Sequence, residues 1–163
     1  MNISTLRSKV IAASLALAFG SLLPAGAQAA EAHGHGAGAV ESLRLNSGKK
    51  WATDAPLRKG TIEIRNAIAA NKDAIHAGKL TNAAYDALAA KIDAQVSYIV
   101  ANCKLPADAD AQLHLVLAQV MQGTSAMKGK EKAMSRRAGV EAIAQALDAY
   151  GKHFDHPGWK KLG

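Results

Sequence analysis

The chain contains very little cysteine, proline or aromatic side chain. Its 163 residues include one Cys and four Pro, and aromatic residues make up 4% of the total. A single Cys excludes an internal disulfide, and it also excludes the Cys-x-x-Cys-His motif that attaches haem covalently. The fold therefore depends on the packing of aliphatic and small side chains, and the length suits one domain.

Motifs of known enzyme classes are also missing from the sequence. It has no nucleophile elbow, no glycine-rich phosphate loop after a strand and no pair of carboxylates positioned by a motif. Cys103 with His114 or His153 is a conceivable pair of nucleophile and base, but no orienting motif accompanies these residues. The sequence therefore predicts a protein without catalytic activity.

Residues 1–29 have the organisation of a secretory signal peptide. Arg7 and Lys9 precede an apolar stretch over residues 10–23, and Ala27–Ala29 forms a small-residue cleavage pattern. We expect cleavage near Ala29 and a location in the periplasm or outside the cell. No second apolar run of roughly 20 residues follows, so the sequence predicts no membrane span. An exported chain without a basic stripe interleaved with aromatics is not expected to bind nucleic acid.

Residues 30–50 are rich in Gly, Ala and His, with His33 and His35 among them. A segment of this composition cannot bury enough apolar surface to order itself, so we predict a flexible, disordered tail. Short tracts that contain several histidines often bind metal ions. His33 and His35 are therefore candidate metal ligands.

From Trp51 onward, apolar residues recur with helical period. Glycine or proline separates four segments, and Asp54, Thr81 and Ser135 are suitable N-caps. The expected helices lie between Asp54 and Gly78, Thr81 and Lys104, Pro106 and Gly129, and Ser135 and His156. Their apolar stripes are Leu57, Ile64, Ile68 and Ile75; Tyr85, Leu88, Ile92, Val96 and Ile99; Leu113, Leu117, Val120, Thr124 and Met127; and Val140, Ile143, Leu147, Tyr150 and Phe154.

Each expected helix is about 30 Å long, and the first two connections are short, so consecutive helices should pack antiparallel. One narrow apolar stripe per helix is typical of four helices that close on one another. The sequence therefore predicts an all-α fold, an up-down-up-down antiparallel four-helix bundle over residues 51–163.

Because consecutive helices of the expected bundle run in opposite directions, its single cysteine and several of its histidines fall near the same end. Four potential metal ligands fall near that end: Cys103, His114, His153 and His156. Imidazole nitrogens and a thiolate suit copper or zinc, and bundle interiors commonly hold such sites. We therefore predict that these four residues bind copper or zinc, assisted by the two histidines of the tail.

Other interpretations of the same residues stay open. His114 lies one helical turn after Asp110 and can hydrogen-bond to it. Cys103 can serve as a small apolar side chain in the last turn of its helix, or it can join two copies through a disulfide. The chain is accordingly expected to be a monomer or a dimer.

The opposite end of the expected bundle carries a basic connector. It contains one acidic residue, Glu131, among Lys128, Lys130, Lys132, Arg136 and Arg137, in a chain whose formal net charge is +7. Such a run is either a solvated loop or a surface that binds an acidic protein partner or an anionic membrane. The alternative function is therefore a non-catalytic structural or interaction module that docks through this end.

The layout resembles the soluble periplasmic four-helix cytochromes, of both the c-prime type and the b type. The b-type resemblance implies a Met near the start of the first helix and a His near the end of the last. His153 matches the latter, but Leu57 and Thr61 occupy the region of the former. Haem held by His114 and His153 is therefore a third, disfavoured possibility.

Three segments resemble an uncharacterised family of exported bacterial helical proteins: Trp51–Arg58, Asn102–Leu105 and His153–Trp159. The resemblance covers most of the chain that follows the signal peptide. It implies the fold and the compartment, and it carries no activity.

Overall fold

The computed structural model describes residues 38–162, and this part of the chain is all-helical, as predicted. It contains a short 3-10 helix, η1 (Ala39–Ser42), and the helices α1 (Ala55–Ala69), α2 (Lys72–His76), α3 (Asn82–Asn102), α4 (Ala107–Met127) and α5 (Arg136–His153). Within residues 38–162 the only β-type pairings are two isolated bridges. The predicted signal peptide and the two tail histidines, His33 and His35, lie outside the described residues.

Side-chain caps fix the starts of three helices at the predicted residues. Asp54 accepts a hydrogen bond from the backbone N–H of Leu57 at 2.8 Å, at the start of α1. Thr81 and Ser135 cap α3 and α5 in the same way. Each cap satisfies a backbone donor that has no partner inside the helix, so these three predictions are confirmed.

The first predicted helix, from Asp54 to Gly78, is divided into α1 and α2. The break lies at Asn71, whose side-chain Nδ2 donates to the carbonyl of Ala67. In a continuous helix this carbonyl would accept from the backbone N–H of Asn71. That N–H turns to the carbonyl of Ile68 instead, at 3.0 Å. Local bonding by an Asn side chain therefore competes with the helix and bends the chain.

The predicted apolar stripes form the core. All of their residues are buried, including Ile75 in the separate helix α2. The most enclosed large side chains include Leu57, Ile92, Leu113 and Tyr150, one from each long helix. The helical period of the sequence therefore identifies the buried face of each helix correctly.

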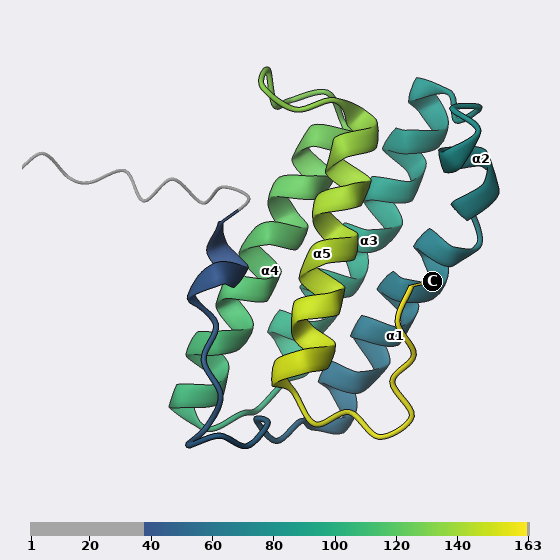
Figure 1. The fold of residues 1–163 in the computed structure, drawn as a ribbon. Helices are drawn as coiled ribbons and strands as arrows, with labels where there is room; N and C mark the ends of the chain where they lie inside the picture. Colours follow the sequence, from purple (N-terminus) through teal and green to yellow (C-terminus); the bar gives the residue numbers. More distant parts are fainter. Residues whose placement is uncertain (1–37, 163) are drawn as a thin grey trace, which may run out of the picture. The chain divides into compact units, whose positions relative to one another are not determined.

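The long helices α1, α3, α4 and α5 lie side by side, and two pairs pack most extensively (Figure 1). In the α4–α5 pair, glycines bring the two backbones together, and a Cβ on Gly139 would lie 2.5 Å from the carbonyl oxygen of Gly123. In the α1–α3 pair, Ile99 fills the space that a side chain at Gly60 would need. Contacts between the two pairs, α3 with α4 and α1 with α5, are less extensive.

The segment that precedes α1 packs on the helices. Leu43 is buried in the core, and the backbone N–H of Arg44 donates to Gln112 of α4 at 2.7 Å. Further along the same segment, Trp51 contacts the end of α5, because its backbone N–H donates to the carbonyl of His153 at 2.8 Å. Residues 38–50 thus differ from the flexible segment expected for residues 30–50. An isolated apolar residue such as Leu43 gives no periodic signal, so composition alone does not predict its burial.

The C-terminal segment after α5 folds back along α1 (Figure 1). Arg65 holds it by donating to the backbone carbonyls of Lys160 and Lys161, at 2.5 and 3.1 Å. Trp159 packs on Gly151, where a Cβ would lie 2.4 Å from the indole nitrogen. This segment therefore covers part of the seam between α1 and α5.

None of the helices in residues 38–162 combines the length and the apolar character needed to cross a bilayer.

We predict that Gly139→Ala destabilises the protein by roughly 1–3 kcal/mol, because the added methyl group meets backbone atoms of α4 that cannot move aside. Urea unfolding followed by circular dichroism measures the change. Gly38→Ala is the matched control, since the nearest atoms to its new Cβ are 3.6 Å away on the flexible Glu41 side chain. Equal stability of both variants would contradict the close α4–α5 contact.

Candidate functional site

Cys103 ends α3 beside the carboxylate that caps α1. One Asp54 oxygen accepts from the backbone N–H of Lys104 at 2.6 Å, and the carboxylate lies near the Cys103 thiol. Burial raises the pKa of Cys103 to about 12, and the neighbouring Asp54 charge adds to the effect. The pKa of Asp54 is lowered, because hydrogen bonds from Lys104 and Leu57 outweigh the effect of burial. The thiol is therefore protonated at neutral pH, which makes it a poor nucleophile.

His156 is buried within an aromatic cluster. Its Nδ1 lies 2.9 Å from the hydroxyl of Tyr150, and its ring contacts Trp159 at 5.1 Å between centroids. Burial, together with the nearby Arg58, lowers the pKa of His156 and favours the neutral imidazole. Trp159 packs edge-on against Tyr150, so the indole covers this end of the helices.

The other two histidines are bonded to their own helices. His114 has a side chain that is 68% exposed, and its Nδ1 lies 2.9 Å from the backbone carbonyl of Asp110. His153 makes the same kind of contact with the carbonyl of Ala149, at 2.8 Å. Each imidazole therefore has a partner one helical turn earlier, which is the local alternative that the sequence left open for His114.

The structure does not bring the four predicted ligands together. In residues 38–162 no three His, Cys, Asp or Glu side chains are grouped closely enough to hold a metal ion. Cys103 and His114 line one pocket of about 270 Å³ between α3 and α4, but His153 and His156 are not among its lining residues. The predicted four-residue copper or zinc site is thus not assembled. Haem held by His114 and His153 stays a prediction.

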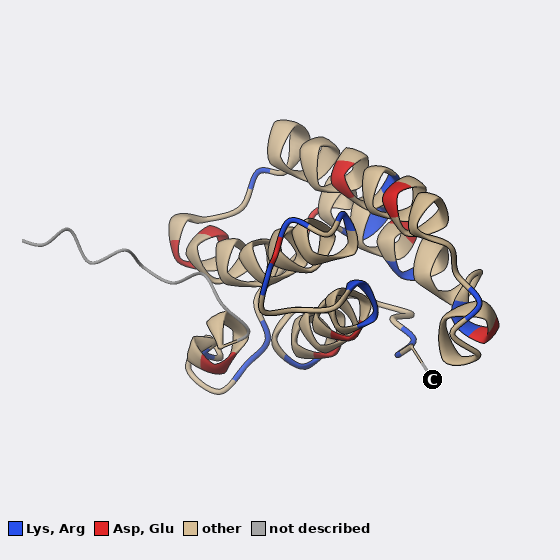
Figure 2. Ribbon diagram, turned by 90° about the horizontal axis from the view of Figure 1, so that it is seen from above, with Lys and Arg blue, Asp and Glu red and all other residues tan. Residues whose placement is uncertain are grey.

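The basic connector is largely neutralised by residues of the helices. Lys128 pairs with Asp93 of α3, and Arg137 pairs with Glu141 at 3.1 Å. Arg136 binds Asp86 and also donates to the carbonyl of Met127 at the end of α4. Figure 2 shows basic and acidic positions interspersed along the helices rather than segregated by sign. Only part of the predicted basic surface, at Lys130 and Lys132, is therefore left without an ion pair in the described chain.

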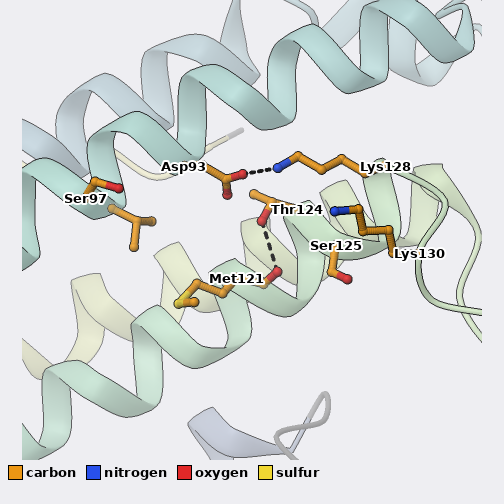
Figure 3. Close-up of a pocket in the computed structure, with 8 residues that line it drawn as sticks. Asp93, Ser97, Met121, Thr124, Ser125, Lys128 and Lys130 are labelled. Carbon is orange, nitrogen blue, oxygen red and sulfur yellow. Dashed lines mark hydrogen bonds and ion pairs between the residues drawn. The ribbon is translucent and has the colours of Figure 1, made fainter.

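Two pockets lie along the seam between α3 and α4. The pocket at the connector end has a volume of about 260 Å³, and there the Asp93–Lys128 pair lies above Thr124 and the Lys130 side chain extends toward the same space (Figure 3). One turn further along α4, the pocket of Cys103 and His114 continues the seam. We call the surface formed by the residues of both pockets the α3–α4 groove.

Two large apolar side chains are exposed at this groove. Val100, in the pocket of Cys103, is 65% exposed, and Met121, in the pocket of Lys130, is 55% exposed. Sequence reasoning assigned neither a function, although a large apolar residue off the core stripe, such as Val100, is a usable signal. The groove therefore combines apolar surface with ammonium and hydroxyl groups.

No family model, curated protein or solved structure matches the chain. The resemblances to exported helical proteins and to four-helix cytochromes therefore stay predictions.

We predict that Cys103 reacts with iodoacetamide at pH 8 roughly 10- to 100-fold more slowly in the folded protein than in urea, because its raised pKa leaves little thiolate. Mass spectrometry of alkylated protein measures both rates. Asp54→Asn keeps a residue that caps helices well but removes the negative charge, so it should lower the Cys103 pKa and speed the reaction. Equal rates in the folded and unfolded chain would contradict the environment described for the thiol.

We predict that Zn²⁺ or Cu²⁺ leaves the melting temperature unchanged when both tail histidines are replaced in the full chain (His33→Ala with His35→Ala). A metal stabilises a protein only when the folded state offers it a better site than the unfolded state does, and residues 38–162 offer no three-ligand group. Differential scanning calorimetry with and without metal measures the effect, and a separate calorimetric titration of the unsubstituted chain with metal shows whether the tail binds. A rise in melting temperature that His114→Ala abolishes would restore the predicted site.

Proposed function

We propose that this chain is a non-catalytic interaction module that binds an acidic, amphipathic segment of a partner protein in the α3–α4 groove. The exposure of Val100 and Met121 along one seam carries the proposal. In this proposal the chain is exported by the segment 1–29 and meets its partner in the periplasm or outside the cell.

The apolar part of the argument rests on where exposed side chains gather. Among the large hydrophobic residues of the described chain, the exposed ones are Leu45, Ile62, Val100 and Met121, and the last two are the most exposed. Val100 and Met121 each line a pocket on the same seam, and exposed apolar surface at a pocket favours an interaction site. The flexible thioether of Met121 adapts to different apolar partners, which favours a peptide-binding groove.

Charge selects an acidic partner over a basic one. Lys128 and Lys130 line the connector end of the groove, and the only acidic residue there, Asp93, is already paired with Lys128. The hydroxyls of Ser97 and Ser125 add hydrogen-bonding groups to the same wall. A carboxylate from a partner would therefore meet an ammonium group next to apolar surface, which gives both affinity and orientation.

The proposal includes an up-down-up-down four-helix bundle as its scaffold. Three contacts support this arrangement, because they join helix ends that alternating direction would place together. Asp54 at the start of α1 accepts a hydrogen bond from Lys104 after α3. Trp51 donates to His153 at the end of α5 and accepts from Asp155 just after it. In such a bundle the short connection between α3 and α4 keeps these two helices adjacent. They pack less extensively on each other than the α4–α5 and α1–α3 pairs do, which leaves room for the groove between them.

A synthetic helical peptide with Leu on one face and Glu on the other tests the proposal. We expect saturable binding, with NMR shifts confined to the residues of the α3–α4 groove, and an affinity loss of about tenfold or more in Val100→Glu and in Met121→Glu. Ile62→Glu is the matched control, because Ile62 is also exposed but lies on α1, outside both pockets. Isothermal titration calorimetry measures each affinity.

Two results would overturn this function. One is equal binding of the corresponding Leu/Lys peptide, since Lys130, which has no ion pair in the described chain, should repel it. The other is binding to vesicles of anionic lipid that Met121→Glu leaves unchanged, because the partner would then be a membrane surface reached through another face.

A further inference from the structure

A second cleft, of about 200 Å³, lies on a different seam, between the α1–α2 corner and α5. Leu162 of the C-terminal segment also lines it. We propose that this cleft binds a small single-chain amphiphile with an anionic head group, whose apolar chain enters between α1 and α5. The site shares no residue with the α3–α4 groove and does not depend on the function proposed above.

The bend at Asn71 builds the cleft. Ile68, at the end of α1, and Ile75, in α2, both line it and both are buried in the core. A straight helix from Asp54 to Gly78 would continue past this point, but the break turns α2 so that the two isoleucines form a corner. Val140 of α5 closes the opposite side. The floor of the cleft is therefore apolar.

The entrance of the cleft is cationic. Lys72 and Arg137 both line it and are exposed, and the one carboxylate there belongs to Glu141. Arg137 donates its Nε to Glu141 at 3.1 Å, and a guanidinium carries further donors for a second anion. An anionic head group would thus meet two cations at the mouth while its chain is removed from water.

The volume limits the ligand to a short chain. An apolar cavity of about 150 Å³ accommodates a benzene ring, so about 200 Å³ suits a chain of roughly eight carbons. Leu162 narrows the cleft on the side where Arg65 holds the C-terminal segment. A longer chain would have to displace that segment, and the cleft therefore favours a free small amphiphile over the two chains of a membrane lipid.

Calorimetric titration of the full chain with octanoate, below its micelle concentration, tests this site. We expect saturable binding with NMR shifts at Ile68, Ile75 and Val140. The pair Lys72→Gln and Arg137→Gln, at exposed positions, should weaken binding about tenfold or more. Lys79→Gln is the matched control, because Lys79 is exposed but does not line the cleft. Octylammonium, with the same chain and the opposite charge, should bind at least about tenfold more weakly.

A filling substitution provides an independent readout. Ala144→Phe should occupy the cleft and abolish octanoate binding, whereas Met121→Glu should leave it intact and so separates this site from the groove. The melting temperature of each variant shows that it is folded. Equal affinity for octanoate and octylammonium, insensitivity to the glutamine pair, binding mapped to Val100 and Met121, or binding only to phosphatidylglycerol vesicles would each overturn the proposal.

Discussion

The contact between the backbones of α4 and α5 at Gly123 and Gly139 is the constraint on which the rest of the structure depends. Without side chains at these positions, Ile143 packs directly on α4 and the two backbones come close together. Gly60 allows a comparable approach of α1 to Ile99 on α3. Close packing within each pair leaves less extensive contact between the pairs. Both proposed binding surfaces lie on these looser seams, so they result from the placement of a few glycines.

Local signals in the sequence predict much of the fold. Asp54 and Ser135 cap helices because a cap needs only a side-chain acceptor and a neighbouring backbone donor. The stripe residues are buried because the helical period determines which face of a helix is apolar. The break at Asn71 was missed, since an Asn within a periodic segment bends the helix only when its side chain captures a carbonyl. The contact of Arg44 with Gln112 joins residues far apart in the sequence, and no local signal predicts it.

The candidate site was less accessible to sequence reasoning, for a physical reason. Periodicity places a residue along a helix, but the orientation of a polar side chain depends on the hydrogen bonds that it finds. His114 and His153 each find the carbonyl four residues earlier, which turns their imidazoles onto their own helices. His156 finds the hydroxyl of Tyr150 and is buried with it. Histidines that lie at the same end of the helices therefore form a metal site only when hydrogen bonds within their own helices leave their ring nitrogens free to bind the metal.

Arg136 has a consequence for the connector between α4 and α5. Its guanidinium binds the Met127 carbonyl and the Asp86 carboxylate, so the end of α4 and the start of α5 are fixed to α3. Lengthening an exposed loop costs little free energy when its ends are already held. Within the connector, Lys130 belongs to the α3–α4 groove and Glu131 accepts a hydrogen bond from Ser125 of α4, whereas Lys132 and Ala133 are exposed and line neither binding surface. A fluorophore or an affinity sequence inserted between Lys132 and Ala133 would therefore report on the molecule without altering either binding surface.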